Sequence, residues 1–274
     1  SAAHPILITP DWVDGHAAFL GGVISRLTVE VKGDTPKTVP ALQLSDVKDR
    51  EEKLAKILRA RCAKSIEPPI ANWKKLIMEA IEANGQHIDP KNNRHKAALD
   101  EQATALESIC SRRLSVLTGG AGTGKTSVVG GLVRCNALQQ DGLLLLAPTG
   151  KARVRLQGAT RGDAMTVAQF LHRLKRYDGS RQRPLFSGKE TYRSAKTVVI
   201  DEASMLTMDD LYAVLQALDL THVQRLILVG DPNQLPPIGV GRPFADLITW
   251  LGSLSASDRT EDVQLSAALA RLTV

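Results

Sequence analysis

The sequence is poor in cysteine and in aromatic residues, and it contains no long hydrophobic run. Its three cysteines form no CxxC pair and have no His-rich segment near them, which favours reduced thiols over a disulfide or a metal site. No apolar run approaches the ~20 residues that a membrane-spanning helix needs. The first residues lack the basic and apolar regions of a secretion signal. We therefore expect a cytoplasmic protein that makes no contact with a membrane.

The composition still allows a large core. Aromatic residues make up 4% of the chain and hydrophobic residues 43%, so the core must be built mainly from aliphatic side chains. The 274 residues allow one large domain, or one ordinary domain and a smaller one. Residues 149–197 contain twelve Lys or Arg against three Asp or Glu. This cationic segment suggests a polyanionic partner, although a solvated surface explains the charge alone equally well.

The first 90 residues differ in pattern from the rest. Residues 21–31 alternate like a short strand, and residues 44–65 and 68–85 have the apolar spacing of amphipathic helices. The polar segment after them contains a proline and predicts a boundary. We expect a partly helical N-terminal region over residues 1–90, without a catalytic motif and with a structural or protein-binding role. A second domain is expected over residues 91–274.

Beyond that boundary, helical patterns alternate with short apolar runs. Four of these runs are LSVLT, LLLLAP, TVVID and RLILVG. Near-continuous apolar strands separated by helices are typical of a parallel sheet that is covered on both faces, so the sequence predicts an α/β fold. Ligands of such sheets bind beyond the carboxyl ends of the strands. Each run here leads directly into a polar motif.

The run LSVLT leads into GGAGTGKT, which satisfies the pattern GxxxxGK[ST] between an apolar strand and a helix. The glycines allow backbone N–H groups to point at phosphate oxygens, and the helix N-terminus adds partial positive charge. Lys125 would contact the β- and γ-phosphates, and the Thr126 hydroxyl is the expected Mg²⁺ ligand. The predicted nucleotide-contacting residues of this loop are Gly119, Gly120, Ala121, Gly122, Thr123, Gly124, Lys125 and Thr126.

The run TVVID ends in an acidic pair, Asp201 and Glu202. Asp201 can bind Mg²⁺, usually through water, and Glu202 can polarise the attacking water. Acidic residues are also favourable at the start of a helix, so the pair alone has a structural alternative. Together with the phosphate-binding loop, the pair indicates hydrolysis of the nucleotide and not binding alone.

The run RLILVG leads into DPNQLPPIG, which contains Gln234 and two prolines. The uncharged amide of Gln234 could hydrogen-bond a γ-phosphate, and the prolines stiffen the loop that carries it. Asp-Pro-Asn is equally good turn chemistry. The residues alone do not decide between a phosphate contact and an ordinary turn.

The run LLLLAP leads into TGKARVRL, where a strand gives way to a helix. Short polar residues and backbone N–H groups at such a point can hold a second anion, such as a nucleic-acid phosphate. The candidates are Thr149, Gly150, Lys151 and Arg153. A turn–helix junction with solvated basic residues is the alternative. Aromatic residues among the basic residues that follow, such as Phe170, would suit stacking on single-stranded bases, although any one of them is better explained as a core residue.

The motifs GGAGTGKT, APTGKAR, DEASML and GDPNQLPPIG, in this order and at these intervals, resemble the first motor domain of superfamily 1B DNA helicases, the RecD-like group. The resemblance covers most of the chain. It implies a RecA-like fold, a requirement for ATP and Mg²⁺, and translocation 5′ to 3′ along single-stranded DNA. It also implies that Gln102 reads the adenine edge and that Gln234 couples the γ-phosphate to the strand-binding surface. By the same resemblance, Thr149, Lys151 and Thr166 lie near single-stranded DNA.

Members of this group continue into a second RecA-like domain, whose arginines reach the γ-phosphate of the same ATP. The present chain stops near the point where that connection would begin, and Arg242 and Arg259 are interpreted as surface residues. We therefore expect a fragment of a longer motor that binds Mg·ATP, hydrolyses it slowly and fails to unwind a duplex alone. One alternative is a nucleotide-gated DNA-binding or scaffold module without turnover. Another is a clamp-loader-type ATPase, which the APTGKAR motif disfavours.

Overall fold

The computed structural model describes residues 15, 20, 22–31, 37–89, 91–255 and 259–273. The chain divides into two compact units, Ser1–Ile57 and Leu58–Val274, which are described separately. The segment predicted to lack a secretion signal lies outside the described residues. Within the described residues, no helix is long and apolar enough to cross a membrane. All three cysteines are buried free thiols.

The first unit contains an antiparallel pair of strands and the beginning of a helix. β1 (Ile24–Val31) pairs with β2 (Lys37–Leu44) in a register that places Ile24 opposite Leu44. α3 (Ser45–Cys62) follows β2 directly. The alternating segment of the sequence thus forms the predicted strand, and the first predicted amphipathic segment forms the predicted helix.

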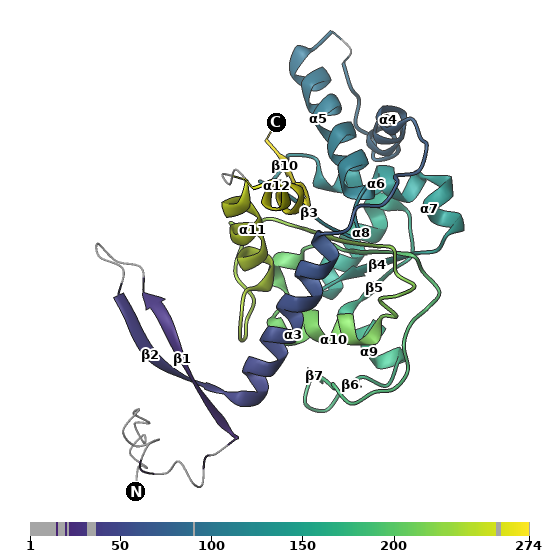
Figure 1. The fold of residues 1–274 in the computed structure, drawn as a ribbon. Helices are drawn as coiled ribbons and strands as arrows, with labels where there is room; N and C mark the ends of the chain where they lie inside the picture. Colours follow the sequence, from purple (N-terminus) through teal and green to yellow (C-terminus); the bar gives the residue numbers. More distant parts are fainter. Residues whose placement is uncertain are drawn as a thin grey trace, which may run out of the picture. The chain divides into compact units, whose positions relative to one another are not determined.

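The second unit is built on a six-stranded parallel sheet with the strand order β10-β3-β9-β8-β4-β5 (Figure 1). Its strands are β3 (Leu114–Gly119), β4 (Leu143–Ala147), β5 (Ala164–Thr166), β8 (Thr197–Ile200), β9 (Arg225–Gly230) and β10 (Leu269–Leu272). The four apolar runs form β3, β4, β8 and β9, and β8 and β9 are buried along their whole length. The predicted parallel α/β architecture is confirmed.

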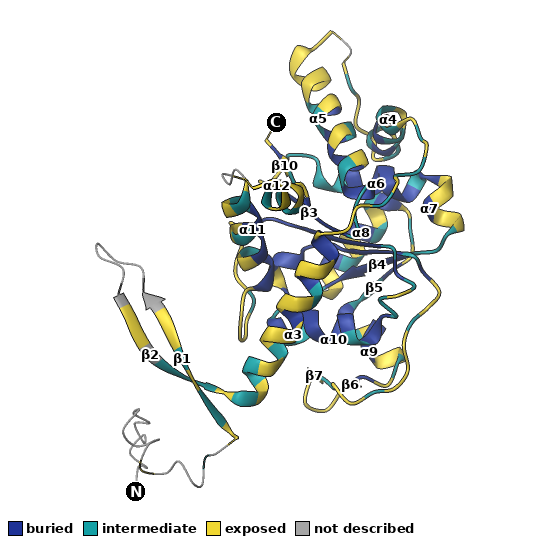
Figure 2. Ribbon diagram, viewed as in Figure 1, coloured by how far each residue is buried: buried dark blue, intermediate teal, exposed yellow. Residues whose placement is uncertain are grey.

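Helices cover both faces of this sheet. They are α4 (Trp73–Ala83), α5 (Asn93–Cys110), α6 (Lys125–Arg134), α7 (Asn136–Gln140), α8 (Gly150–Thr160), α9 (Val167–Arg173), α10 (Met208–Ala217), α11 (Pro243–Leu254) and α12 (Thr260–Ser266). One core joins Leu106 of α5, Leu132 of α6 and Leu156 of α8 to sheet residues such as Leu117. α9, α10 and α11 contribute further buried side chains that are not part of this cluster. Figure 2 shows the buried strands in dark blue between helices with exposed outer surfaces.

Smaller elements lie in the connections between these helices and strands. They are the strands β6 (Tyr177–Asp178) and β7 (Arg183–Pro184), which pair antiparallel, and the 3₁₀ turn η1 (Ala203–Met205). The turn η1 directly follows the acidic pair, and β6 and β7 belong to the cationic segment.

α4 packs within the second unit, so the structural division differs from the boundary expected near residue 90. Ile77 and Ala80 of α4 are fully buried. Ideal Cβ atoms on Gly131 and Gly130 of α6 would approach Ile77 and Ala80, respectively, to 3.0 Å. The two glycines therefore allow α4 and α6 to pack closely. The polar segment interpreted as a domain boundary is a connection between α4 and α5.

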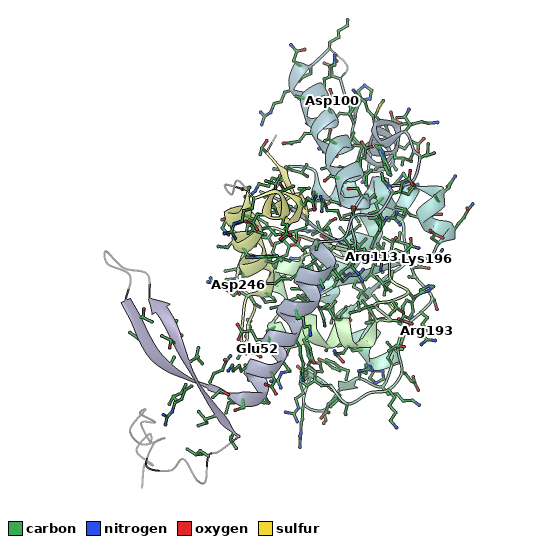
Figure 3. The ribbon with its side chains drawn as sticks, in the orientation of Figure 1. Glu52, Asp100, Arg113, Arg193, Lys196 and Asp246 are labelled. Atoms are coloured by element: carbon green, nitrogen blue, oxygen red, sulfur yellow. The ribbon has the colours of Figure 1, made fainter. Side chains whose placement is uncertain are left out.

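The edge of the sheet where the strands begin carries charged residues with structural contacts. Arg113 precedes β3 and Lys196 precedes β8; both are labelled in Figure 3. Lys196 Nζ lies 2.6 Å from Asp141 Oδ1. The buried Arg61, at the end of α3, donates from Nη2 to Arg113 O at 2.9 Å. The motifs with candidate chemistry lie at the opposite side of the sheet, at the carboxyl ends of the strands.

Candidate nucleotide-binding site

The phosphate-binding loop joins β3 to α6 and has the backbone that its glycines predict. Gly122 and Gly124 adopt φ values of 82° and 87°, in the left-handed region that favours glycine. Thr123 Oγ1 donates to Gly120 O at 2.9 Å and stabilises the turn. α6 begins at the end of this loop. The first N–H groups of a helix have no partner within the helix, so those of α6 are available to a ligand at this position.

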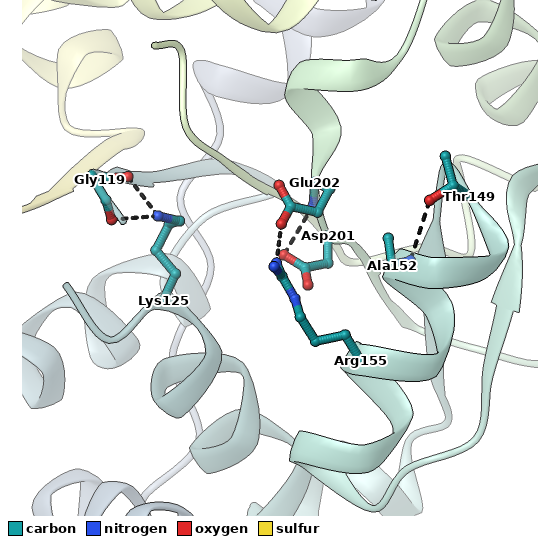
Figure 4. A network of polar contacts seen from close by, with 8 residues as sticks. Gly119, Lys125, Thr149, Ala152, Arg155, Asp201 and Glu202 are labelled. Carbon is teal, nitrogen blue, oxygen red and sulfur yellow. Dashed lines mark hydrogen bonds and ion pairs between the residues drawn. The ribbon is translucent and has the colours of Figure 1, made fainter. Parts of the chain in front are cut away.

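Lys125 and Gln102 both converge on the loop. Lys125 Nζ donates to Gly119 O at 2.5 Å and to Gly120 O at 2.8 Å, as Figure 4 shows. Gln102, on α5, is 7% exposed, and its Nε2 donates to Thr123 O at 3.5 Å. Gln102 Oε1 is buried and has no hydrogen-bond partner within the described part of the chain. Such an oxygen costs free energy unless a ligand supplies a donor.

The acidic pair follows β8, and both of its side chains are buried. Asp201 Oδ1 accepts a hydrogen bond from the Glu202 N–H at 2.9 Å, and Glu202 adopts a left-handed φ of 52°. Burial, and next the negative charge of Glu202, raise the pKa of Asp201 to about 6, against the opposing charges of Arg155 and Lys125. A strained backbone and a raised carboxyl pKa are both typical of functional sites.

Arg155 forms an ion pair with Glu202, a contact that the sequence analysis did not assign. Arg155 lies on α8, and Figure 4 shows its side chain extending to the acidic pair. The other carboxylate oxygen, Glu202 Oε2, is buried and lacks a hydrogen-bond partner among the described residues. One sequence signal points to Arg155, because it follows Lys151 by four residues and therefore shares its helical face.

The loop after β9 lies between the phosphate-binding loop and the acidic pair, because β9 pairs with both β3 and β8. Asp231 is buried, and its Oδ1 accepts from the Asn233 N–H at 2.9 Å. The Gln234 N–H donates to Asp231 O at 3.2 Å, and residue Gln234 is exposed. The turn chemistry predicted from Asp-Pro-Asn is present. The position of the loop is also compatible with the γ-phosphate contact expected of Gln234.

Thr149 follows β4 and is the N-cap of α8, and Thr166 is the last residue of the adjacent strand β5 and the N-cap of α9. The Thr149 hydroxyl accepts from the Ala152 N–H at 3.2 Å, and Gly150 is the first residue of α8. Thr166 and Gln169 form a capping box with hydrogen bonds of 3.0 and 2.9 Å. Both hydroxyls therefore stabilise helix ends, as the turn–helix alternative anticipates.

Two basic residues of α8, Lys151 and Arg155, are exposed and Arg153 is partly buried, whereas the aromatic Phe170 of α9 is buried. Lys151 is exposed, and Arg153 Nη1 donates to Gln157 Oε1 at 3.0 Å. Phe170 is 1% exposed and packs edge-to-face on Tyr192, with ring centroids 5.5 Å apart. Phe170 is a core residue, which confirms the interpretation that the sequence favours for a single aromatic residue and excludes base stacking at this position.

The loop and the acidic pair fit a nucleotide with Mg²⁺. An ideal Cβ on Gly119 would lie 2.5 Å from Thr123 Oγ1 and 2.9 Å from Leu272 O, so the backbone leaves no room for a side chain there. Thr126 lies in the first turn of α6, and Asp201 supplies a buried carboxylate. Mg²⁺ is usually held by one or two protein oxygens together with phosphates and water. A larger cluster is not required, and the described residues contain none.

A parallel sheet that ends in a phosphate-binding loop and a buried acidic pair defines a P-loop nucleotide-binding domain of the RecA-like kind. A sequence family described as an AAA domain matches residues 97–273. The chain belongs to this family. Its relatives support a RecA-like domain similar to those of the RecD-like group of superfamily 1B.

Three relatives show the extent of the similarity. The chain is 30% identical over 240 residues to the uncharacterized protein MJ1519 of Methanocaldococcus jannaschii, covering 81% of this chain and 20% of that protein. It is 34% identical over 186 residues to the RecBCD enzyme subunit RecD of Mycolicibacterium smegmatis, covering 59% and 32%. It is 35% identical over 188 residues to the ATP-dependent RecD2 DNA helicase of Deinococcus radiodurans, covering 66% and 24%. The chain thus spans 20% to 32% of the length of these relatives.

Proposed function

We propose that this domain binds Mg·ATP, hydrolyses it in response to single-stranded DNA, and supports movement 5′ to 3′ along the strand. The strongest support is one observation. The phosphate-binding loop, the buried acidic pair and the basic start of α8 follow strands of one parallel sheet and lie at the same edge of it. Nucleotide binding, hydrolysis and strand contact need these groups in one place.

The nucleotide and its metal would be held by the loop backbone and by side chains from three elements and their connections. Lys125 moves from the loop carbonyl groups to the β- and γ-phosphates, while Thr126 and Asp201 hold Mg²⁺. When bound there, Mg²⁺ would supply positive charge beside the phosphates. Glu202 accepts a proton from the attacking water. The Gln102 amide suits adenine, because it can donate to N7 and accept from the N6 amino group.

The strand would be held at the start of α8 and α9. The side chains of Lys151 and Arg153 and the backbone of Gly150 suit phosphate oxygens. The hydroxyls of Thr149 and Thr166 accept from helix N–H groups and can still donate to a phosphate. These contacts bind the backbone of the strand without reading its sequence.

Movement along DNA requires more than one domain in this proposal. Gln234, on the loop between the two nucleotide motifs, contacts the γ-phosphate and couples it to the strand-binding surface. A second RecA-like domain of a longer parent chain completes the motor, in keeping with the 20% to 32% of the relatives that this chain spans. Residues 1–90 have a structural role or contribute contacts to a partner protein.

Single-turnover hydrolysis of ATP, with and without oligo(dT), tests the proposal. We expect wild-type protein to form ADP slowly, and faster with oligo(dT). Glu202→Gln removes the general base and should lower the rate at least ~100-fold. Lys125→Ala should abolish thermal stabilisation by ATP without unfolding the protein, because Lys125 contacts the loop and not the core. Product formation that is independent of Glu202 would contradict the proposal.

A second candidate function is a nucleotide-gated strand-binding or scaffold module that does not turn over. The ion pair of Glu202 with Arg155 favours it, because this pair occupies the expected general base. The same assay separates the two functions. A scaffold module would be stabilised by ATP, and ATP would change its affinity for oligo(dT), but no Glu202-dependent ADP would form.

A further inference from the structure

The ion pair between Arg155 and Glu202 joins two motifs that have separate roles in the proposed function. Arg155 belongs to α8, which follows β4, and Glu202 follows the adjacent strand β8. The Arg155 side chain is 60% exposed, whereas the Glu202 side chain is 7% exposed. The carboxylate of the pair is therefore buried, and the guanidinium is exposed to solvent.

In this conformation, the ion pair and burial both restrict the access of water to Glu202. Oε1 is paired with Arg155, and Oε2 is buried without a hydrogen-bond partner within the described residues. A general base must hydrogen-bond the water from which it takes a proton. The ion pair with Arg155 therefore opposes the action of Glu202 as a base.

The exposed guanidinium of Arg155 is open to competition from a phosphate. Arginine binds phosphate through two parallel hydrogen bonds, as it binds a carboxylate. Lys151 lies one helical turn before Arg155 on α8, and side chains four residues apart on a helix are neighbours. A strand phosphate that contacts Lys151 is therefore within reach of Arg155.

We propose that Arg155 is a switch between the strand and the general base: it holds Glu202 inactive until a phosphodiester of bound single-stranded DNA takes its guanidinium. The proposal rests on the proposed function, because it assumes that Glu202 is the base and that the start of α8 binds the strand. Arg155 acts through Glu202 and is a positioning residue. Such a switch explains how strand binding at α8 raises the rate of ATP hydrolysis at the acidic pair.

Binding of a fluorescent oligo(dT) without ATP tests the switch independently of hydrolysis. If the strand must displace Glu202, then Glu202→Gln frees Arg155 and should tighten strand binding about fivefold, the shift expected of one partly exposed ion pair. Asp201→Asn is the matched control, because it removes a neighbouring charge and leaves the ion pair in place. It should give a smaller gain. Equal gains from both substitutions would overturn the proposal.

Arg155→Gln tests the other partner of the pair. We expect the slope of log affinity against log salt to fall by about 0.7, the value for one lost single-strand phosphate contact. Combined with Glu202→Gln, it should abolish the tighter binding that Glu202→Gln gives alone. Arg94→Gln removes an exposed arginine on α5 and should leave the salt slope unchanged. A loss of ATP affinity with an unchanged slope would assign Arg155 to the γ-phosphate and overturn the proposal.

Hydrolysis without DNA provides the second readout. Arg155→Gln should raise the strand-free rate about fivefold and reduce the stimulation by oligo(dT) toward none. Arg155→Lys keeps the charge beside the buried carboxylate and is therefore the variant with the smaller risk to folding. Its strand-free rate should lie between the rates of the wild type and of Arg155→Gln. A strand-free rate that is unchanged or lower in both variants would contradict the switch. A wild-type protein without Glu202-dependent hydrolysis would instead contradict the proposed function and leave the binding test valid.

Discussion

At the scale of single residues, several features of the site reduce stability. Glu202 adopts a left-handed backbone conformation, Asp201 is a buried carboxyl group with a raised pKa, and Gln102 Oε1 is buried without a partner among the described residues. Each of these features lowers the free energy of unfolding. If these residues serve ligand binding at the expense of stability, then some substitutions at these positions should stabilise the protein.

Asp201→Asn should stabilise the protein at neutral pH. The pKa of Asp201 rises from 3.8 to about 6 on folding, so the folded state binds this proton more tightly than the unfolded chain. Stability is therefore lost as the pH rises from about 4 to about 6, and the cost above this window is on the order of 3 kcal/mol. Asparagine avoids this cost and keeps the oxygen that accepts from the Glu202 N–H. Thermal unfolding in EDTA at pH 7.5 and pH 4.5 measures the difference.

The control substitution, Asp219→Asn, should change stability in the opposite direction. Hydrogen bonds, first among them that from the Thr221 hydroxyl, lower the pKa of Asp219. Asp219→Asn should therefore lower the melting temperature at pH 7.5. A melting temperature of Asp201→Asn that is equal to or below that of the wild type at pH 7.5 would show that burial of Asp201 carries no such cost.

Gly124→Ala should weaken both the fold and the binding of ATP. Gly124 has a φ of 87°, and a Cβ atom at this position would collide with the Gln102 amide. We expect a loss of ~1–2 kcal/mol in the free energy of unfolding. Gly158→Ala is the matched control, because its Cβ would meet nothing within 4 Å in α8 and should stabilise the protein by ~0.5–1 kcal/mol. Urea denaturation and titration calorimetry with ATP give the two values, and unchanged values for Gly124→Ala would contradict the close contact with Gln102.

At the scale of the element, α8 connects the two proposed surfaces. Its first turn carries Lys151 and Arg153, and its second turn carries Arg155. The double change Lys151→Glu and Arg153→Glu should weaken oligo(dT) binding and lower the salt slope by ~1.4, since each single-strand phosphate contact accounts for ~0.7. The same charge reversal at Arg94 and Lys96, on α5, should leave the slope as it is. An unchanged slope for the α8 variant would return Lys151 and Arg153 to the solvated alternative.

Elements that follow one another along the chain could be predicted, whereas contacts between distant elements could not. The phosphate-binding loop and the acidic pair each follow directly from an apolar strand that leads into a polar motif. The pairing of Arg155 with Glu202 depends on β4 lying beside β8, and the strand order is not written in a local pattern. The packing of α4 against Gly131 is likewise a tertiary contact. The burial of Phe170 agrees with the core role that the sequence favours for a single aromatic residue, but its contact with Tyr192 is again a tertiary contact.

At the scale of the whole molecule, the candidate site lies entirely within the unit Leu58–Val274. The main core cluster also lies within this unit, and Arg61 ties the end of α3 to it through hydrogen bonds to Arg113 O at 2.9 Å and Val223 O at 2.9 Å. Removal of residues 1–44, which keeps α3 intact, should therefore leave the melting temperature and the stabilisation by ATP unchanged. Loss of cooperative unfolding would show that the second unit depends on the first.

The most direct test of the account is a crystal structure of the chain with Mg²⁺ and a non-hydrolysable ATP analogue. We predict that Lys125 Nζ leaves the carbonyl groups of Gly119 and Gly120 for the β- and γ-phosphates, and that Thr126 and Asp201 lie at the metal. The adenine should contact the Gln102 amide. An analogue bound at another surface, or a structure at saturating analogue in which these residues make no contact with it, would contradict the central claim.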